Sequence, residues 1–145
     1  MSMDAQQLAE ASRDAMWADD RASQAAGMSV IAVAPGTATL QMRVRDDMVN
    51  GHGICHGGYM FLLADSTFAF ACNSHNQKAV AHQCAITYLQ PVFENELLTA
   101  TATELVMQGR SGIYDIAIRN DKDEVVAQFR GHSRTTKGQH VETST

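Results

Sequence analysis

Residues 59–73 read YMFLLADSTFAFACN, and this stretch decides the fold. If it forms a helix, apolar side chains cover almost every side of that helix, and only the Asp-Ser-Thr run at 65–67 interrupts them. A helix that is apolar all round is either a buried central helix or a membrane span. The stretch is shorter than the roughly 20 residues that a span needs, so we expect a buried central helix.

Strand-like runs flank this helix on both sides. Residues 37–45 alternate between apolar and polar side chains, which is typical of a strand that is covered on one face. The other strand-like runs are residues 29–34, 79–90, 97–107, 113–120 and 125–135. This order predicts an α+β fold in which an antiparallel sheet wraps around the central helix.

The N-terminal residues predict a second helical region. Residues 4–26 are rich in Ala, Gln and Glu and are followed by a glycine, so we expect a helix with a break near residues 19–20. One sheet cannot cover all sides of an apolar helix, and the uncovered side predicts contact with the N-terminal helix or with a second chain. Without a repeat or a linker, the sequence predicts one domain, 1–136, of which 1–27 form the helical lead-in, and a polar, frayed tail at 137–145.

The composition indicates a folded protein with an acidic balance. Of the 145 residues, 45% are apolar and 19% are charged, and the formal net charge is −5. Nucleic acids and anionic membranes need a broad basic surface, so we expect neither as a partner, whereas a local basic cluster can still bind a small anion. The odd number of cysteines and the absence of a signal-like N-terminus predict free thiols and a cytoplasmic location.

Residues 50–58, which read NGHGICHGG, run directly into the central helix. Two glycines at a helix start, Gly57 and Gly58, leave backbone N–H groups that a ligand can approach closely. Together with the helix dipole, these groups favour a developing negative charge, such as the oxyanion that forms when a carbonyl is attacked. The same two glycines are also compatible with a tight turn alone.

Asp65 is an acid inside the apolar helix, and a buried ionisable group without a partner is costly. It follows Gly58 by two helical turns, about 10 Å along the axis, which is too far for it to act on a carbonyl held at its own helix start. An antiparallel second copy of the helix brings its Asp65 to the glycines of the first copy. These features predict a dimer with active sites between chains. In the alternative interpretation, Asp65 only bonds Ser66 or Thr67.

The run at 50–58, followed by Leu62-Leu63-Ala64-Asp65, resembles the hotdog-fold acyl-CoA thioesterases of the phenylacetate-degradation (PaaI) type, and the likeness covers nearly the whole folded chain. The resemblance implies that Asp65 of one subunit is the nucleophile or general base. It implies that Gly57 and Gly58 of the other subunit polarise the thioester carbonyl. It also implies that Asn50 positions water or the thioester and that His56 orders the loop.

The resemblance extends to the substrate and the assembly. It implies hydrolysis of an aryl-acetyl-CoA, such as phenylacetyl-CoA or a hydroxylated form, by a homodimer or, more often, a dimer of dimers. Coenzyme A is then part of the substrate, and no cofactor is expected.

Because coenzyme A carries several phosphate charges, an acidic protein must bind it through a local basic patch. In the last strand, alternation places two arginines on one face and a serine on the other, and a loop before residue 113 adds a further cation and backbone donors. The candidate contacts are Arg110, Ser111, Gly112, Arg130, Ser133 and Arg134. In the alternative interpretation, these residues only form a solvent-exposed outer face of the sheet and bind no nucleotide.

Other functions are compatible with parts of the sequence. Histidines and cysteines cluster between residues 52 and 84, but no CxxC pair exists, so we expect no metal site. A serine hydrolase is disfavoured because the sequence has no G-x-S-x-G elbow. Two alternatives stay open. One is a hotdog enoyl-CoA hydratase or dehydratase that pairs His56 with Asp65, and the other is a non-catalytic acyl-CoA-binding subunit.

Overall fold

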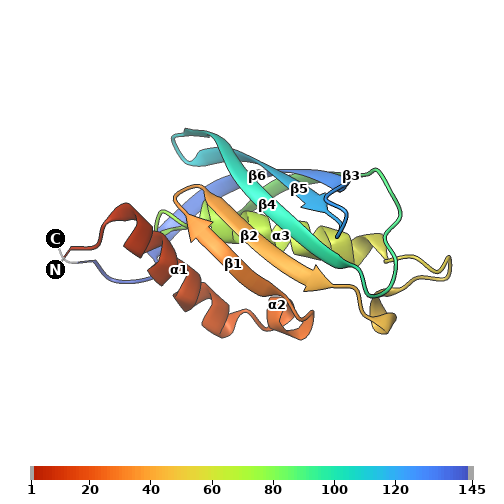
Figure 1. Ribbon diagram of the computed structural model, residues 1–145. Helices are drawn as coiled ribbons and strands as arrows, with labels where there is room; N and C mark the ends of the chain where they lie inside the picture. Colours follow the sequence, from red (N-terminus) through yellow and green to blue (C-terminus); the bar gives the residue numbers. More distant parts are fainter. Residues whose placement is uncertain (1, 144–145) are drawn as a thin grey trace.

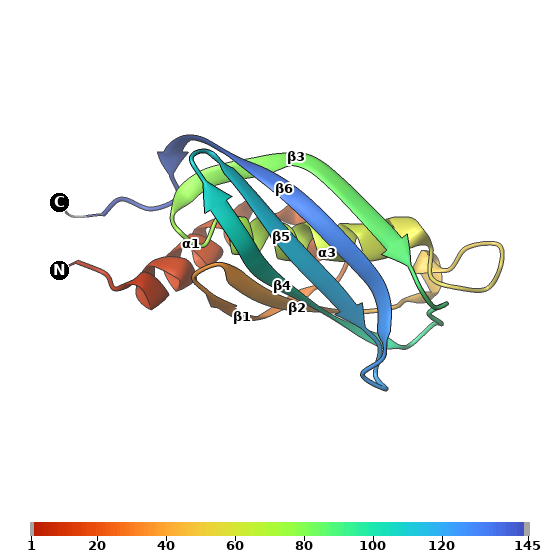
Figure 2. The same ribbon diagram turned by 90° about the horizontal axis from the view of Figure 1, so that it is seen from above.

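A six-stranded antiparallel sheet wraps around one long helix, α3 (Gly57–Cys72), in the computed structural model, which describes residues 2–143 (Figure 1, Figure 2). The strands lie in the order β1-β2-β4-β5-β6-β3, so β1 and β3 form the two edges. The predicted α+β architecture with an N-terminal helix is confirmed. The remaining elements are α1 (Ala5–Asp19), α2 (Arg21–Ala25), β1 (Ser29–Ala34), β2 (Thr37–Arg43), η1 (Asp46–Met48), β3 (Gln77–Tyr88), β4 (Leu97–Gln108), β5 (Ser111–Arg119) and β6 (Val125–Gln139).

The sheet covers one side of α3 and leaves another side partly open. Leu63 and Ala64 are completely buried against the sheet, where β2 contributes the inward-facing side chains that its alternation predicted. On the other side of the helix, Leu62, Asp65 and Ala69 are only half-buried, and their spacing places them in one line along the axis. We call these three residues the open stripe. A single chain therefore covers its central helix incompletely.

The N-terminal helices cover α3 beside the open stripe. The expected break occurs at Asp20, whose carboxylate caps α2 by accepting a hydrogen bond of 3.0 Å from the Ser23 backbone N–H. The Ser23 hydroxyl also lies 2.8 Å from the hydroxyl of Ser66 in α3, and the ring of Trp17 packs near that of Phe70. These contacts fix the lead-in against the helix but leave the open stripe for another partner.

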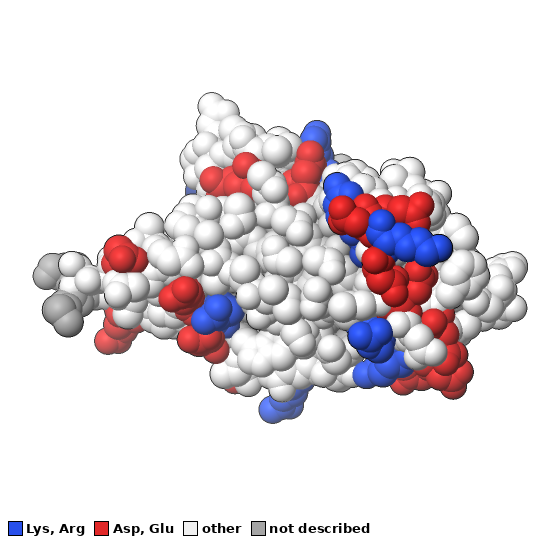
Figure 3. Space-filling view, viewed as in Figure 1, with Lys and Arg blue, Asp and Glu red and all other residues white. Residues whose placement is uncertain are grey.

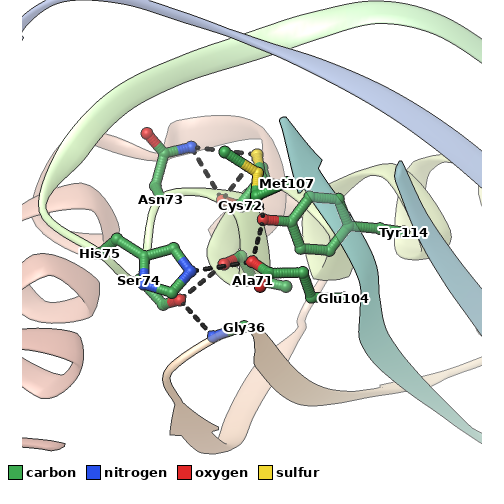
Figure 4. Close-up of polar contacts among 10 residues, drawn as sticks. Gly36, Ala71, Cys72, Asn73, Ser74, His75, Glu104, Met107 and Tyr114 are labelled. Atoms are coloured by element: carbon green, nitrogen blue, oxygen red, sulfur yellow. Dashed lines mark hydrogen bonds and ion pairs between the residues drawn. The ribbon is translucent and has the colours of Figure 1, made fainter. Parts of the chain in front are cut away.

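The C-terminal end of α3 is tied to the sheet by a polar network (Figure 4). The Ser74 hydroxyl accepts a hydrogen bond of 2.8 Å from the Gly36 backbone N–H. Glu104 of β4 receives two contacts on one carboxylate oxygen, from the Tyr114 hydroxyl at 2.6 Å and from a His75 ring nitrogen at 2.8 Å. These hydrogen bonds hold the pKa of Glu104 below its usual value although partial burial acts in the opposite direction. The network lies at the end of the helix away from Gly57 and Gly58.

The last strand is longer than the sequence indicated. We expected it to end at residue 135 and the chain to fray from 137, but β6 continues to Gln139, which pairs with Gln77 of β3. Beyond the strand, the Asn76 side-chain oxygen accepts from the backbone N–H groups of His140 and Val141. The polar composition of this segment does not indicate a strand, because its pairing partner, β3, lies far away in the sequence. Residue 1 of the expected lead-in and residues 144–145 of the expected tail lie outside the described residues.

The charged side chains do not form a broad basic surface on the face that Figure 3 displays. Acidic and basic groups alternate there, and large areas carry neither. Within residues 2–143, no helix combines the length and the apolar character that a membrane crossing needs.

Candidate active site

The loop before α3 is folded around Asn50 and His56. The Asn50 side-chain oxygen accepts hydrogen bonds from the backbone N–H groups of His52 (2.9 Å) and Ile54 (3.3 Å), which turns the loop back on itself. Its side-chain NH₂ group has no partner among residues 2–143, so it is able to donate a hydrogen bond to a ligand. His56 is the N-cap of α3. The loop thus directs polar groups towards the start of the helix, as the sequence suggested.

The two glycine amides differ in what they bind. The Gly58 N–H donates to Nδ1 of His56 at 2.9 Å, so this amide is already used inside the helix cap. The Gly57 N–H makes no hydrogen bond within the described residues. Of the two amides that the sequence offered as oxyanion donors, the Gly57 N–H is therefore the one without a partner in the described residues, and His56 caps the helix.

Gly57 and Asn50 line the same cavity, which has a volume of about 490 Å³. Most of its wall is apolar, and Gly57 forms part of that wall. A pocket of this kind suits an uncharged carbonyl group attached to apolar neighbours. Its other lining residues are Ile54, Cys55, Met60, Tyr88, Leu89, Gln90, Pro91 and Val92.

Asp65 lies in a different cavity, of about 370 Å³, on the open stripe. Its carboxylate makes no hydrogen bond or ion pair within residues 2–143, and burial raises its pKa. The alternative in which Asp65 merely bonds Ser66 or Thr67 is wrong, because Ser66 bonds Ser23 and the Thr67 hydroxyl donates to the Leu63 carbonyl. An unpaired carboxylate in a pocket is available for chemistry.

One chain therefore places the candidate site residues in two separate cavities. Gly57 and Asn50 belong to the first cavity and Asp65 to the second, and neither cavity includes the residues of the other. This separation agrees with the distance of two helical turns that the sequence predicted.

The candidate coenzyme A contacts are only partly brought together. Ser111 and Arg134 are exposed and pair with each other across β5 and β6, and Arg110 lies next to them, with its guanidinium donating to the Thr135 carbonyl. Arg130 instead forms an ion pair with Asp115, with atoms 2.7 Å apart.

Two other candidates point the opposite way. Gly112 and Ser133 face the interior and pair across the same two strands, and the Ser133 hydroxyl is buried without a hydrogen-bond partner among residues 2–143. A Cβ on Gly112 would lie 2.6 Å from that hydroxyl. Because these residues are buried against each other, they do not lie on the outer surface with the arginines, although both line a cavity of about 180 Å³ together with Ser111.

The cysteines and histidines are dispersed. No three His, Cys, Asp or Glu side chains in the described part of the chain lie close enough together to hold a metal ion. Burial raises the pKa of Cys55 to about 11 and that of Cys72 to about 12, so both thiols stay protonated near neutral pH. They have the properties of small core residues.

Three residues at the two cavities were not singled out from the sequence. Tyr88 lies beside Gly57 in the first cavity, and Lys78 and His140 line the second cavity together with Asp65. Each is distant in sequence from the residue that it accompanies, and the pairing of β3 with β6 brings the last two together. No local pattern could have identified them.

Replacing His56 with Ala is expected to destabilise the protein by about 1 kcal/mol, because the Gly58 N–H loses its cap. The loss of kcat should be smaller than that caused by a change at Asp65, since His56 supports the loop and does not react. His56→Asn should recover most of the stability, because an Asn side chain can cap the same N–H. Thermal unfolding of the three proteins measures this, and equal melting temperatures for the Ala variant and the native chain would contradict it.

Comparisons with known proteins identify the family and the fold of the chain. Residues 52–127 match the family model described as Thioesterase superfamily. The chain is 44% identical to acyl-coenzyme A thioesterase PaaI of Escherichia coli K12 over 86% of its length and 89% of that protein. The structure of the E. coli PaaI protein from the phenylacetic acid degradation operon superposes with a TM-score of 0.92, at 40% identity, covering 94% of this chain and 99% of that one. A mutant of the phenylacetic acid degradation protein PaaI of Thermus thermophilus superposes with a TM-score of 0.76, at 33% identity, covering 79% of this chain and 97% of that one.

Proposed function

The chain belongs to the thioesterase superfamily and has the hotdog fold of PaaI, and on that premise we propose that it hydrolyses the thioester bond of an aryl-acetyl-CoA at a site built by two copies of the chain. Phenylacetyl-CoA or a ring-hydroxylated form is the favoured substrate. The observation that carries the proposal is the unpaired carboxylate of Asp65 on the open stripe of α3. The association of the PaaI relatives with phenylacetic acid degradation supports the acyl group.

The reaction follows from the two halves of the site. The Gly57 N–H of one copy donates to the thioester oxygen, where negative charge develops as the carbonyl carbon is attacked. Asp65 of the other copy takes a proton from a water molecule that attacks the carbonyl carbon, the C–S bond breaks, and coenzyme A leaves as the thiolate. Alternatively, Asp65 attacks the carbonyl carbon itself and expels the thiolate, and water then hydrolyses the resulting acyl anhydride to release the acid and the carboxylate. A raised pKa makes the Asp65 carboxylate a stronger base than an ordinary aspartate. The Asn50 side-chain NH₂ holds the water or the thioester.

The proposed dimer is supported by the edge of the sheet. β3 is an edge strand along its whole length of 12 residues, and most of its side chains are exposed. An open edge of this length is a ready template for pairing with another chain. Exposed apolar side chains also gather at and beyond it, among them Val80 (54% exposed) and Leu89 (56% exposed). Two-fold pairing of β3 with its copy covers this edge and brings two α3 helices together antiparallel.

The remaining parts of the proposal concern binding and location. Arg110, Ser111 and Arg134 form the patch that meets the phosphates of coenzyme A. No cofactor takes part besides the coenzyme A of the substrate. A dimer of dimers is the proposed assembly, and the cytoplasm is the proposed location, which three free cysteines support.

The hydratase alternative is not favoured by the geometry. Such an enzyme needs a histidine that is free to exchange a proton with the substrate. Nδ1 of His56 accepts the Gly58 N–H, which leaves only Nε2 for such an exchange, and the family that residues 52–127 match is that of thioesterases. The non-catalytic alternative predicts that the chain binds acyl-CoA without turnover.

Release of free coenzyme A, followed with a thiol-reactive dye, tests the function. The substrates are phenylacetyl-CoA, its ring-hydroxylated forms and a panel of short to medium aliphatic acyl-CoAs. We expect thiol release from the native chain that is fastest with the aryl-acetyl group. A folded sample that releases no thiol from any of these thioesters would overturn the proposed activity, and a preference for aliphatic chains would overturn the acyl group only.

Arg134→Ala is expected to raise the KM for acyl-CoA by about 3- to 5-fold with kcat unchanged, because an exposed cation contributes modestly to binding a phosphate. Arg130→Ala should have a smaller effect, since the guanidinium of Arg130 is already paired with Asp115. Steady-state kinetics at low and high salt measure both. The difference between native and Arg134→Ala should shrink at high salt. Equal KM values at low salt would remove Arg134 from the binding patch.

A further inference from the structure

Both ends of one peptide group at the start of α3 are held by side chains. The Gly57–Gly58 peptide donates its N–H to Nδ1 of His56 at 2.9 Å, and its carbonyl oxygen, which belongs to Gly57, accepts from the Tyr88 hydroxyl at 2.7 Å. His56 comes from the loop before the helix, whereas Tyr88 is the last residue of β3. Two separate parts of the chain thus fix the plane of this peptide.

Tyr88 also fits closely over Gly57. A Cβ on Gly57 would lie only 2.9 Å from the Tyr88 ring carbon and hydroxyl, so the ring occupies the space that any other residue would need. The strand end that carries Tyr88 is anchored as well, because the Leu89 N–H donates to the Val126 carbonyl at 2.8 Å. Tyr88 lines the same cavity as Gly57 and Asn50.

We propose that Tyr88 is a positioning residue that orients the free Gly57 N–H towards the substrate carbonyl. The inference rests on the proposed function, because it assigns that N–H to the thioester oxygen. A glycine pair has an unusually free backbone, so an oxyanion donor placed there needs external support to stay preorganised. His56 and Tyr88 supply it by restraining the peptide that follows the donor. Tyr88 itself does not contact the reacting atoms in this arrangement.

Burial raises the pKa of the Tyr88 phenol, so the hydroxyl remains a donor throughout the neutral range. The contribution of such a hydrogen bond to catalysis differs from its contribution to stability. Tyr88 is 48% exposed, so we expect loss of its hydroxyl to lower the stability of the folded state only slightly. Loss of the hydroxyl does loosen the orientation of the Gly57 N–H. This change weakens the stabilisation of the transition state more than the binding of the substrate.

Tyr88→Phe, which keeps the ring and removes only the hydroxyl, tests the proposal. We expect kcat for phenylacetyl-CoA to fall by about 5- to 10-fold, with KM and the melting temperature close to the native values. Tyr114→Phe is the matched control, because it also removes a phenol hydroxyl that donates a hydrogen bond, but in the network at the other end of α3. That variant should lose stability and keep the native kcat.

Two non-hydrolysable coenzyme A thioethers give a second readout. In the first compound, a CH₂ group joins the sulfur to a ketone carbonyl. In the second, the sulfur carries a plain alkyl chain of the same length. Tyr88→Phe should raise the Kd of the ketone by about 2-fold, which is less than the fall in kcat, and leave that of the alkyl compound unchanged, because only the ketone uses the Gly57 N–H and it uses it less than the transition state does. Native kcat in Tyr88→Phe, or equal changes in both Kd values, would overturn the role of Tyr88 while the thioesterase activity of the native chain stands. A native chain without thiol release would instead overturn the proposed function, and this inference with it.

Discussion

Asp65→Asn is expected to lower kcat for acyl-CoA hydrolysis by about 10³-fold, because an amide can neither accept the proton of water nor attack the carbonyl at a comparable rate. The fold should remain intact, since the Asp65 carboxylate has no hydrogen bond to lose within residues 2–143. Thiol release and size-exclusion chromatography of the variant measure the two effects. Near-native turnover in a folded variant would remove Asp65 from the mechanism and leave the non-catalytic alternative as the better account.

The stability of the same variant separates a catalytic from a structural role. Burial raises the pKa of Asp65 above the ordinary value of 3.8, so the folded chain holds the proton more tightly than the unfolded chain does. Ionisation of Asp65 therefore costs stability at pH values above the folded pKa, and this cost vanishes below the unfolded pKa. Asn carries no charge to bury, so at pH 7 Asp65→Asn should melt at the native temperature or above it. A lower melting temperature would indicate a structural role for the carboxylate.

The raised pKa also has a kinetic consequence. If the Asp65 carboxylate is the active form, kcat/KM of the native enzyme falls as the pH decreases through the pKa of Asp65. The midpoint of this acidic limb should lie above the value for an ordinary aspartate. Activity is thus lost at a higher pH than a solvent-exposed carboxylate would give.

Features that depend on one element could be predicted from the sequence. The alternation of residues 37–45 placed Ala38, Leu40 and Met42 on the inner face of β2, where all three are buried. Helical spacing alone separated Asp65 from Gly58 by two turns, and the structure places Asp65 and Gly57 in different cavities. The periodicity of side chains and the rise per residue depend only on the local conformation, so their consequences can be predicted from the sequence without knowledge of the tertiary structure.

Features that depend on two distant elements could not be predicted. The choice between the two glycine amides follows from the ring orientation of His56, and Tyr88 reaches Gly57 only because β3 ends above the start of α3. Similarly, Ser133 was included with its neighbouring arginines as a nucleotide contact although its own alternation turned it inward, against Gly112. Sequence proximity is a poor guide on a strand, because adjacent side chains face opposite sides of the sheet.

A mixture of two inactive variants is expected to recover activity if the site is shared between chains. Gly57→Ala should lose about 10²-fold in kcat, because its Cβ would collide with Tyr88 and displace the oxyanion donor. Gly57 has an ordinary negative φ, so Ala fits the backbone and the helix should still form. Asp65→Asn is inactive for the independent reason given above. The two substitutions therefore inactivate different halves of the proposed site, the oxyanion donor and the carboxylate.

In a dimer of one Asp65→Asn chain and one Gly57→Ala chain, one site combines both lesions and the other combines the intact Asp65 with the intact Gly57. Co-expression in equal amounts with random pairing therefore restores about a quarter of the native rate, although each variant alone is nearly inactive. A site contained within one chain cannot be repaired in this way, and the mixture would then give only the sum of the two residual rates. Because the open stripe of α3 and the free edge of β3 lie on the same chain, a two-fold dimer that covers both builds two such sites at once. The amount of recovered activity consequently measures how catalysis is divided between the two copies.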